Sequence, residues 1–262
     1  MLIQNSDCIW ESMNPQLAAP LFAGWDDTMI WSCLQGVMGH IYVDSLQQPR
    51  SAMALLGDFC FFAGEPKEAL VAYKPSICQQ DYMIMTAQTQ GWLGLIEQVY
   101  GQKARKRQRY AFKKEAQGFQ VEKLQGFVAG LSSEFTLCMI DRTWFHYCRS
   151  HAWCADFVSL YQDYETFQQL GLGVLALRQG EPVAGASSYS RYRDGIEIEI
   201  DTKEAYRRQG LATACAAKLM LCCLERGLYP SWDAHNEASA ALAQKLGYQL
   251  EGAYTAYEIM GY

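Results

Sequence analysis

The sequence predicts an α/β (α+β) protein, because strand-like and helix-like periods alternate along the chain. The clearest change of period lies in residues 196–217, IEIEIDTKEAYRRQGLATACAA. Its first half alternates isoleucines with acids, the period of two of a β-strand: Ile196, Ile198 and Ile200 with Glu197, Glu199 and Asp201. Apolar residues then recur at helical spacing from Ala212 to Leu224, and Gly227 ends the pattern. A hydrophobic content of 50% is enough for a sizeable core.

The first part of the chain predicts elements in the order α-β-β-β-α-β. We expect a helix over 25–38, strands over 40–43, 52–62 and 83–87, a helix over 92–100 and a strand over 105–113. Two glycines and two serines in 121–133 predict a boundary between two domains, 1–128 and 129–262. The first would be a smaller α/β companion domain.

The second part predicts a longer series of elements. We expect a strand over 135–140, helical segments over 144–150 and 154–170, and strands over 173–178 and 183–189 separated by a Gly-Glu-Pro turn. The strand at 196 and its helix follow, then a strand over 229–234, a helix over 236–247 that Asn236 can cap, and a final strand.

Charge and cysteine usage restrict the classes of partner. A net charge of −6 and a pI near 5.3 argue against a general affinity for nucleic acid or an anionic membrane. The ten cysteines are scattered, the start MLIQNSDCIW shows no leader pattern, and no run is long enough to span a membrane. We therefore expect a reduced cytoplasmic protein.

The turn between the central strand and its helix has the chemistry of a phosphate site. It reads Arg207-Arg208-Gln209-Gly210-Leu211-Ala212. The first turn of a helix carries unpaired N–H groups and the positive end of the helix dipole. Small residues at 210 and 212 let a pyrophosphate approach the backbone, and the two arginines add positive charge.

These residues resemble the acyl-CoA-binding motif of the GNAT superfamily of N-acetyltransferases, Arg/Gln-x-x-Gly-x-Gly/Ala. The stretch 236–248, NEASAALAQKLGY, is similar to the second signature of that family, Asn-x-x-Ser-x-x-Leu-Tyr-x-Lys-Leu-Gly-Phe, and follows in the right order. The resemblance covers the last half of the chain. It implies the GNAT fold with a mixed, mainly antiparallel sheet, and acetyl-CoA as co-substrate.

The resemblance also implies where the coenzyme binds. The backbone at Ile200, Asp201 and Thr202 would pair with the pantetheine arm and polarise the thioester carbonyl. The pyrophosphate would bind the N–H groups at the helix start, beside Arg207 and Arg208, with Arg207 the favoured ligand: Gln209, Gly210, Leu211, Ala212 and Thr213. Asn236 and Ser239 would add coenzyme contacts.

Acetylation of an amine needs a base, because an alkyl ammonium with a pKa of ~10 must lose a proton before it can attack. The acidic face of the central strand favours Glu199 first and Glu197 second, directly or through water. A solvated strand face is the alternative interpretation of these acids. Trp232 and Asp233 are candidates to contact the acceptor, with core packing the alternative for Trp232.

The sequence departs from the family pattern at the residue that protonates the leaving thiolate. The second signature has a tyrosine where this chain has Ala243, after Leu242. Ser239, Tyr248 and Tyr254 are candidate substitutes. Solvent is another, because a thiolate with a pKa of ~8.5 leaves tolerably without help.

Two other groups of residues suggest a metal site and a nucleic-acid-binding strand, but other features argue against both. His146, Cys148, His151 and Cys154 have spacings that do not converge on one helical face, so we expect no metal site. The basic run 103–114 contains Tyr110 and Phe112, but the acidic chain argues against a nucleic-acid-binding strand, so we expect a solvated face.

The sequence thus predicts an N-acetyltransferase that transfers acetyl from acetyl-CoA to a primary amine of a small molecule. The two-part layout is similar to a bacterial group that includes the zwittermicin-resistance type of acetyltransferase, which implies a polyamine-like or amino-polyol acceptor. The first domain would be a degenerate GNAT-like companion that helps to form the substrate cleft, and a homodimer is possible. A non-catalytic acyl-CoA-binding sensor is the alternative.

Overall fold

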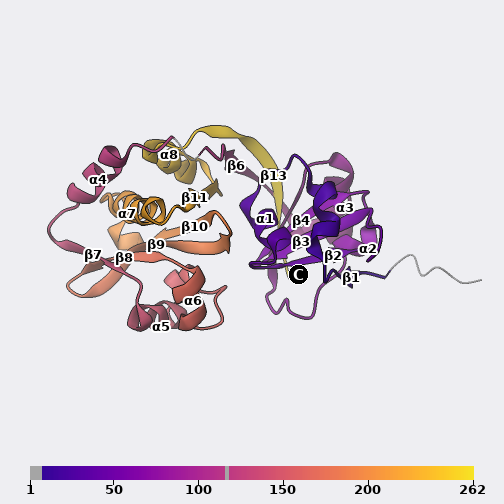
Figure 1. Ribbon diagram of the computed structural model, residues 1–262, viewed down its shortest axis with the longest axis horizontal. Coiled ribbons are helices and arrows are strands. Elements are labelled where there is room, and N and C mark those ends of the chain that lie inside the picture. The colour runs from indigo at the N-terminus through magenta and orange to yellow at the C-terminus, as the bar shows by residue number, and fades with distance from the viewer. Residues whose placement is uncertain (1–7, 116–117) are drawn as a thin grey trace, which may run out of the picture. The chain divides into compact units, whose positions relative to one another are not determined.

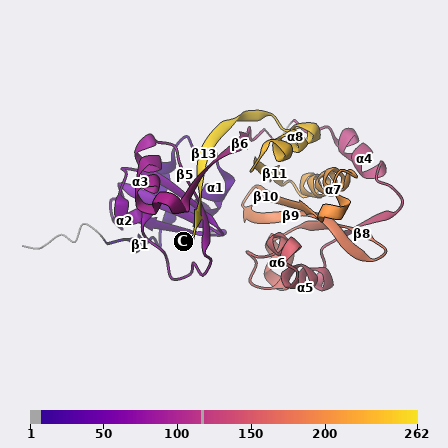
Figure 2. The same cartoon turned by 180° about the vertical axis from the view of Figure 1, so that it is seen from behind.

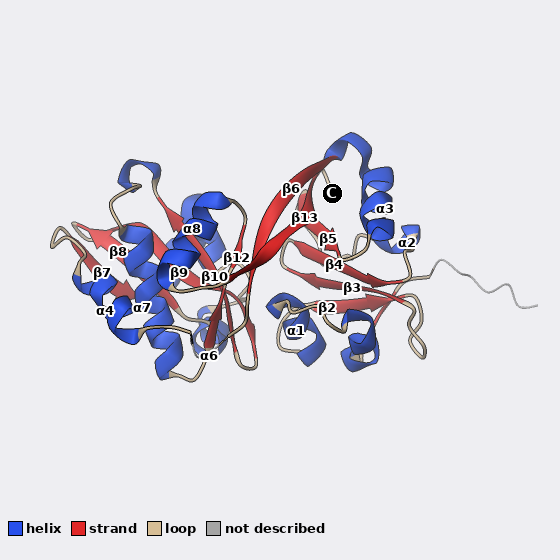
Figure 3. Ribbon diagram, turned by 90° about the horizontal axis from the view of Figure 1, so that it is seen from above, coloured by secondary structure: helices blue, strands red, loops and turns tan. Residues whose placement is uncertain are grey.

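The computed structural model describes residues 8–115 and 118–262 (Figure 1). The expectation that the chain start has no leader pattern rests mostly on residues 1–7, which lie outside this part. The chain divides into two compact units, one of residues up to Arg109 together with Ala253–Tyr262, the other Tyr110–Gly252. This division lies before the expected boundary at 128, because the strand at Ala104–Phe112 and the last strand each pass from one unit into the other (Figure 3).

The first unit contains one sheet in the order β1-β2-β3-β4-β5-β13, antiparallel except between β4 and β5. Its strands are β1 Trp10–Glu11, β2 His40–Val43, β3 Ser51–Leu56, β4 Phe59–Gly64, β5 Tyr82–Ala87 and the end of β13 Leu250–Met260. Its helices are the 3₁₀ segment η1 Pro15–Phe22, α1 Thr28–Gln35, α2 Glu68–Val71, α3 Gln90–Tyr100 and the 3₁₀ turn η2 Gly101–Lys103, which leads into β6 Ala104–Phe112.

The expected single strand over 52–62 is wrong, because the chain reverses in its middle. Gly57 has a positive φ of 58° and forms the turn at which β3 ends and β4 returns antiparallel to it. The other expected elements of this part are present within a few residues of their predicted bounds.

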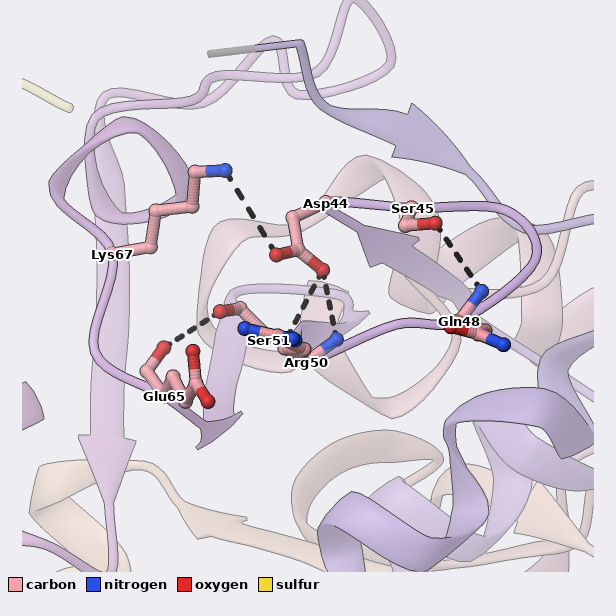
Figure 4. A network of polar contacts seen from close by, with 7 residues as sticks. All are labelled: Asp44, Ser45, Gln48, Arg50, Ser51, Glu65 and Lys67. Atoms are coloured by element: carbon pink, nitrogen blue, oxygen red, sulfur yellow. Dashed lines mark hydrogen bonds and ion pairs between the residues drawn. The ribbon is translucent and has the colours of Figure 1, made fainter. Parts of the chain in front are cut away.

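A polar network closes the loop between β2 and β3 (Figure 4). One carboxylate oxygen of Asp44 accepts hydrogen bonds from the N–H groups of Arg50, at 3.0 Å, and Ser51, at 3.1 Å. The other oxygen lies 3.8 Å from Lys67 Nζ, and the Ser51 hydroxyl donates to the carbonyl of Glu65 at 2.7 Å. The half-buried Asp44 therefore fixes the start of β3, and Ser51 ties that start to the residue after β4.

The second unit contains a sheet in the order β11-β10-β9-β8-β7, antiparallel except between β10 and β11. The strands are β7 Phe135–Met139, β8 Gly173–Arg178, β9 Glu181–Tyr192, β10 Gly195–Thr202 and β11 Tyr229–Ser231, and β12 Asp233–Ala234 pairs with β6. The helices are α4 Val121–Ala129, α5 Arg142–Ser150, α6 Tyr164–Leu170, α7 Leu211–Glu225 and α8 Glu237–Leu246, with 3₁₀ segments η3 Ala152–Phe157 and η4 Glu204–Tyr206. The mixed, mainly antiparallel sheet is as expected.

Helices cover both faces of this sheet, α4 and α7 on one side and α5 and α6 on the other (Figures 1 and 2). Helix α7 packs its apolar face on the sheet through Cys215, Leu219 and Met220, all fully buried. Burial of a leucine or methionine side chain stabilises the fold by about 1.5–3 kcal/mol, so this helix anchors the core.

Two segments differ from the expectation. The glycine-containing stretch at 121–133, where the domain boundary was expected, begins with α4, whose buried Leu124 packs in the same core as α7, while Gly126 lies on the exposed side. The helix expected over 154–170 is interrupted between η3 and α6, and Asp163 caps α6 by accepting from Thr166 N–H at 2.8 Å.

No helix in the described part of the chain is long and apolar enough to cross a membrane.

Candidate active site

The turn before α7 adopts a backbone that exposes the first N–H groups of the helix. Gly210 has φ +81°, and Arg208 is also left-handed at +64°. The first intrahelical bond runs from Ala214 N–H to the Gly210 carbonyl at 3.0 Å, so the N–H groups of Leu211, Ala212 and Thr213 precede the regular ladder. A Cβ built at Gly210 would meet no atom within 4 Å, so the space in front of this turn is open.

The end of β10 carries a further polar group beside this turn. Thr202 is 7% exposed, and its hydroxyl has no hydrogen-bond partner among the residues that the structure describes. Such orphaned groups are rare unless a ligand or water completes them. The open space at Gly210 and the Thr202 hydroxyl are features that fit a phosphate-bearing ligand at this end of β10.

The two arginines of the turn differ in how they are held. Arg207 Nε donates to the Thr202 carbonyl at 3.2 Å, and its Nη2 lies 4.0 Å from Asp201 Oδ1, with 60% of the side chain exposed. Arg208 is exposed. The guanidinium of Arg207 is therefore held against the end of β10 and available to an anion. Gln209 bonds back to the Ala205 carbonyl at 3.4 Å.

A lysine that sequence reasoning did not place here also reaches the helix start. Lys245 Nζ of α8 lies 3.4 Å from the Thr213 hydroxyl. It also lies 5.1 Å from the centroid of the Phe127 ring, which is within cation–π distance. Lys245 stands in the second signature, but its spacing alone did not show that α8 and the start of α7 lie together.

Strands β10 and β11 part in the middle of β10. Their parallel pairing runs over Gly195–Glu197, and its last registered pair joins Glu197 to Ser231. Beyond Ser231 the chain leaves this sheet, and β12 pairs with β6 instead. The edge of β10 from Ile198 to Thr202 that faces away from β9 is thus released from β11, which gives an extended ligand backbone groups to pair with.

The acids of β10 lie on the face opposite α7. Ile196, Ile198 and Ile200 pack into the core with α7, so Glu197, Glu199 and Asp201 point to the side of α5, α6 and η3. Glu197 is 5% exposed, whereas Glu199 and Asp201 are half-buried. Asp201 Oδ1 also accepts from Thr202 N–H at 2.6 Å. Glu199 is therefore more accessible to a substrate than Glu197.

The start of α8 is built by three predicted residues. Asn236 Oδ1 caps the helix by accepting from Ser239 N–H at 2.9 Å, and the Ser239 hydroxyl accepts from the Trp232 indole at 3.1 Å. Asn236 is exposed and Ser239 half-buried. The Ser239 hydroxyl keeps its own hydrogen to donate.

Two predicted residues lie in the core. Trp232 is 1% exposed, and Tyr248 packs against it and donates its hydroxyl hydrogen to the carbonyl of Pro230. Burial raises the pKa of Tyr248 well above its ordinary value, with nearby Tyr229, Cys223 and Glu197 adding to the shift. These contacts give both side chains a packing role. Asp233 is half-buried beside them and pairs with Ala111 of β6.

The thiols set aside as a metal site make local contacts instead. Cys154 Sγ lies 3.8 Å from the Cys148 carbonyl, and His151 stacks on Tyr147. Among the described residues, no group of three or more His, Cys, Asp or Glu side chains is arranged to hold a metal ion.

The chain is similar to known proteins over most of its length. A family model described as GNAT acetyltransferase matches residues 19–257. The crystal structure of a GCN5-related N-acetyltransferase-like protein from Streptococcus suis 89/1591 is 48% identical, with a TM-score of 0.88 over 94% of this chain and 98% of that chain. A GCN5-related N-acetyltransferase from Sphaerobacter thermophilus shares the fold, with a TM-score of 0.60 at 12% identity over 99% of this chain and 97% of that one.

A curated relative matches a shorter stretch. The uncharacterized N-acetyltransferase YdfB of Bacillus subtilis (strain 168) is 37% identical over 93 residues, which are 35% of this chain and 36% of that relative. The family match at 19–257 extends well beyond the last half of the chain, where the sequence resemblance had been placed.

Proposed function

The chain belongs to the GNAT acetyltransferase family, and from this premise we propose that it transfers acetyl from acetyl-CoA to a primary amine of a small-molecule acceptor by direct attack. The observation that carries the proposal is the turn at Gly210, whose left-handed backbone and open front leave the first N–H groups of α7 available to a pyrophosphate. The released edge of β10 lies directly before it in the chain.

The coenzyme contacts follow from this arrangement. The N–H groups at 209–213 bind the pyrophosphate, with Arg207, Arg208 and Lys245 as the neighbouring cations. The backbone at Ile200, Asp201 and Thr202 pairs with the pantetheine arm, and a backbone N–H there polarises the thioester carbonyl. Asn236 and Ser239 contact the coenzyme from the start of α8.

Glu199 acts as the base, with Glu197 deeper on the same strand face. The acceptor ammonium gives its proton to the carboxylate, and the freed nitrogen attacks the thioester carbon. The new C–N bond forms as the C–S bond breaks, and the second proton of the nitrogen passes to the departing thiolate through the Ser239 hydroxyl or solvent. Asp233 adds a negative charge that favours a cationic acceptor.

The leaving thiolate takes its proton from Ser239 or from solvent. Ser239 retains a hydroxyl hydrogen, whereas the Tyr248 hydroxyl is committed to Pro230. A thiolate with a pKa of ~8.5 needs little help, so loss of Ser239 should slow the reaction only modestly.

The proposal is tested by following thiol release from acetyl-CoA with a panel of diamines, polyamines and amino-polyols. We expect at least one amine to raise the rate well above that without amine, and mass spectrometry to find the acceptor heavier by one acetyl group. Thiol release that no amine accelerates would contradict the proposal.

A second candidate function is a non-catalytic acyl-CoA sensor, because the family tyrosine is absent. Ala243, at that position, is fully buried, so the site has no room for a tyrosine there without repacking. The sensor predicts saturable acetyl-CoA binding without amine-dependent turnover, and the same experiment distinguishes it.

A further inference from the structure

Ser231 occupies the position where β11 leaves β10. It is the last residue of β11 and is registered with Glu197. The next residue, Trp232, turns into the core, and the chain continues in β12. Ser231 is therefore the last side chain that β11 places beside the acids of β10.

The Ser231 side chain is fully buried, and its hydroxyl has no hydrogen-bond partner in the described part of the chain. Leaving a buried hydroxyl unpaired costs about 1–3 kcal/mol. Strand β9 offers a contrast, because its equally buried Ser187 donates to the Phe157 carbonyl at 2.7 Å and lies 3.2 Å from the Leu172 carbonyl. The Ser231 hydroxyl thus lacks a partner among residues 8–115 and 118–262, and a bound water would satisfy it.

The side chains beside Ser231 are polar. Glu197 is registered with Ser190 of β9 on one side and with Ser231 of β11 on the other, and directly opposed residues share a face of the sheet. Ser190 and Glu197 are both buried. Three adjacent strands therefore form a short buried polar row: Ser190, Glu197 and Ser231.

The titratable groups around this row are tyrosines, at 192, 229 and 248. Burial raises the pKa of each above the ordinary tyrosine value, and the charge of Glu197 adds to the shift in all three. Arg191 lowers the pKa of Tyr192, and on Tyr229 the backbone of Glu115 lowers the pKa while the Glu115 charge raises it. The tyrosines stay protonated at neutral pH, and Glu197 is the carboxyl group of this row.

We propose that Ser231 is a positioning residue whose hydroxyl holds one buried water against Glu197, and that this water carries a proton from the acceptor ammonium to the Glu197 carboxylate. In the step, an N–H bond of the ammonium breaks, the water gains that proton and passes one of its own to the carboxylate, and the neutral amine is left. Buried waters typically bind polar groups that would otherwise be unsatisfied, and the Ser231 hydroxyl is such a group beside Glu197. The proposal rests on the proposed acetyl transfer, with Glu197 sharing the role of the base.

The test compares Ser231→Ala with Ser231→Thr and with Ser187→Ala. We expect Ser231→Ala to lower kcat at pH 7 by about 10- to 100-fold, with an unchanged KM for acetyl-CoA; this is less than the roughly 10²- to 10⁴-fold that a general base contributes, because the carboxylates remain. Ser231→Thr retains a hydroxyl and should recover most of the rate. Ser187→Ala removes hydrogen bonds to the backbone and should lower thermal stability with little effect on kcat.

The pH profile separates a proton-transfer role from a packing role. The defect of Ser231→Ala should shrink as the pH rises toward ~10, because the amine is then already neutral. A defect of equal size at every pH, or an unchanged kcat in Ser231→Ala, would overturn the proposal while acetyl transfer itself stands. Failure of the unaltered protein to acetylate any amine would overturn both, and is recognised by thiol release that does not depend on amine.

Discussion

Glu197 of β10 and Ser231 of β11 form the last registered pair before the two strands separate. A buried acid and a buried hydroxyl thus stand where the edge of β10 is released from β11, and α7 begins nine residues after the end of β10. One stretch of sequence thus contains a strand edge released from its neighbour, a helix start with an open front and a row of acids.

Glu199→Gln tests the base. We expect kcat with the best amine to fall by about 10²- to 10⁴-fold, because a glutamine cannot accept the ammonium proton, while acetyl-CoA affinity stays the same. Steady-state kinetics and calorimetry measure the two quantities. Glu204→Gln, an exposed acid just past the strand, is the matched control and should behave like the unaltered protein. An active Glu199→Gln variant would assign the proton transfer to another group.

Asn236→Ala tests whether the cap of α8 also binds the coenzyme. Loss of the 2.9 Å cap bond should lower the free energy of unfolding by about 1 kcal/mol. Asp141→Ala removes a cap bond of the same length, to Trp144 N–H of α5, and should cost about as much. Only Asn236→Ala should also weaken acetyl-CoA binding in calorimetry. Equal affinity in both variants would limit Asn236 to capping.

The two arginines of the turn should contribute unequally to acetyl-CoA binding. Arg207→Ala should raise the Kd for acetyl-CoA about tenfold, since a charge-assisted hydrogen bond contributes about 1.5–3 kcal/mol, and should reduce the salt dependence of binding. Arg208→Gly should change the Kd less than about threefold and raise stability slightly, because glycine suits the left-handed φ of +64°. A reversed order of affinities would make Arg208 the ligand.

Asp44→Ala tests the network of the first unit. It removes two hydrogen bonds to backbone N–H groups and should destabilise the β2–β3 loop by about 1–3 kcal/mol. The measurement is hydrogen exchange of the Arg50 and Ser51 amides, which should lose protection together. Ser45→Ala removes only an exposed contact to Gln48 N–H and is the control. Unchanged exchange in Asp44→Ala would show that the loop does not depend on this carboxylate.

The sequence allowed the fold and the helix–turn chemistry of the second unit to be predicted, because period changes and glycine positions are local signals. The turn at Gly210, the cap at Asn236 and the alternation in β10 are all of this kind. Strand register and long-range packing are not local. The sequence therefore did not reveal that 229–234 divides between two sheets at Ser231, that Lys245 reaches Thr213, or that Tyr248 is buried against Trp232.

The turn between β3 and β4 and the helix α4 were not predicted, for a similar reason. The turn at Gly57 lies within an almost continuous apolar run, so the sequence showed no polar loop there. Helix α4 contains Gly126 on its exposed side, and the helix is stabilised by packing of Leu124 rather than by its own propensity. In both places tertiary contacts outweighed the local pattern.

The most direct test of the central claim is calorimetric titration of acetyl-CoA into the unaltered protein, Gly210→Leu and Gly180→Leu. Both glycines are left-handed, at φ +81° and +84°, with no atom within 4 Å of a built Cβ, so the two variants carry the same backbone strain. We predict saturable heat for the unaltered protein and for Gly180→Leu, and a loss of affinity of at least about 100-fold for Gly210→Leu, whose side chain would block the helix N–H groups. Absence of heat from the unaltered protein, or equal affinity in both variants, would contradict the account.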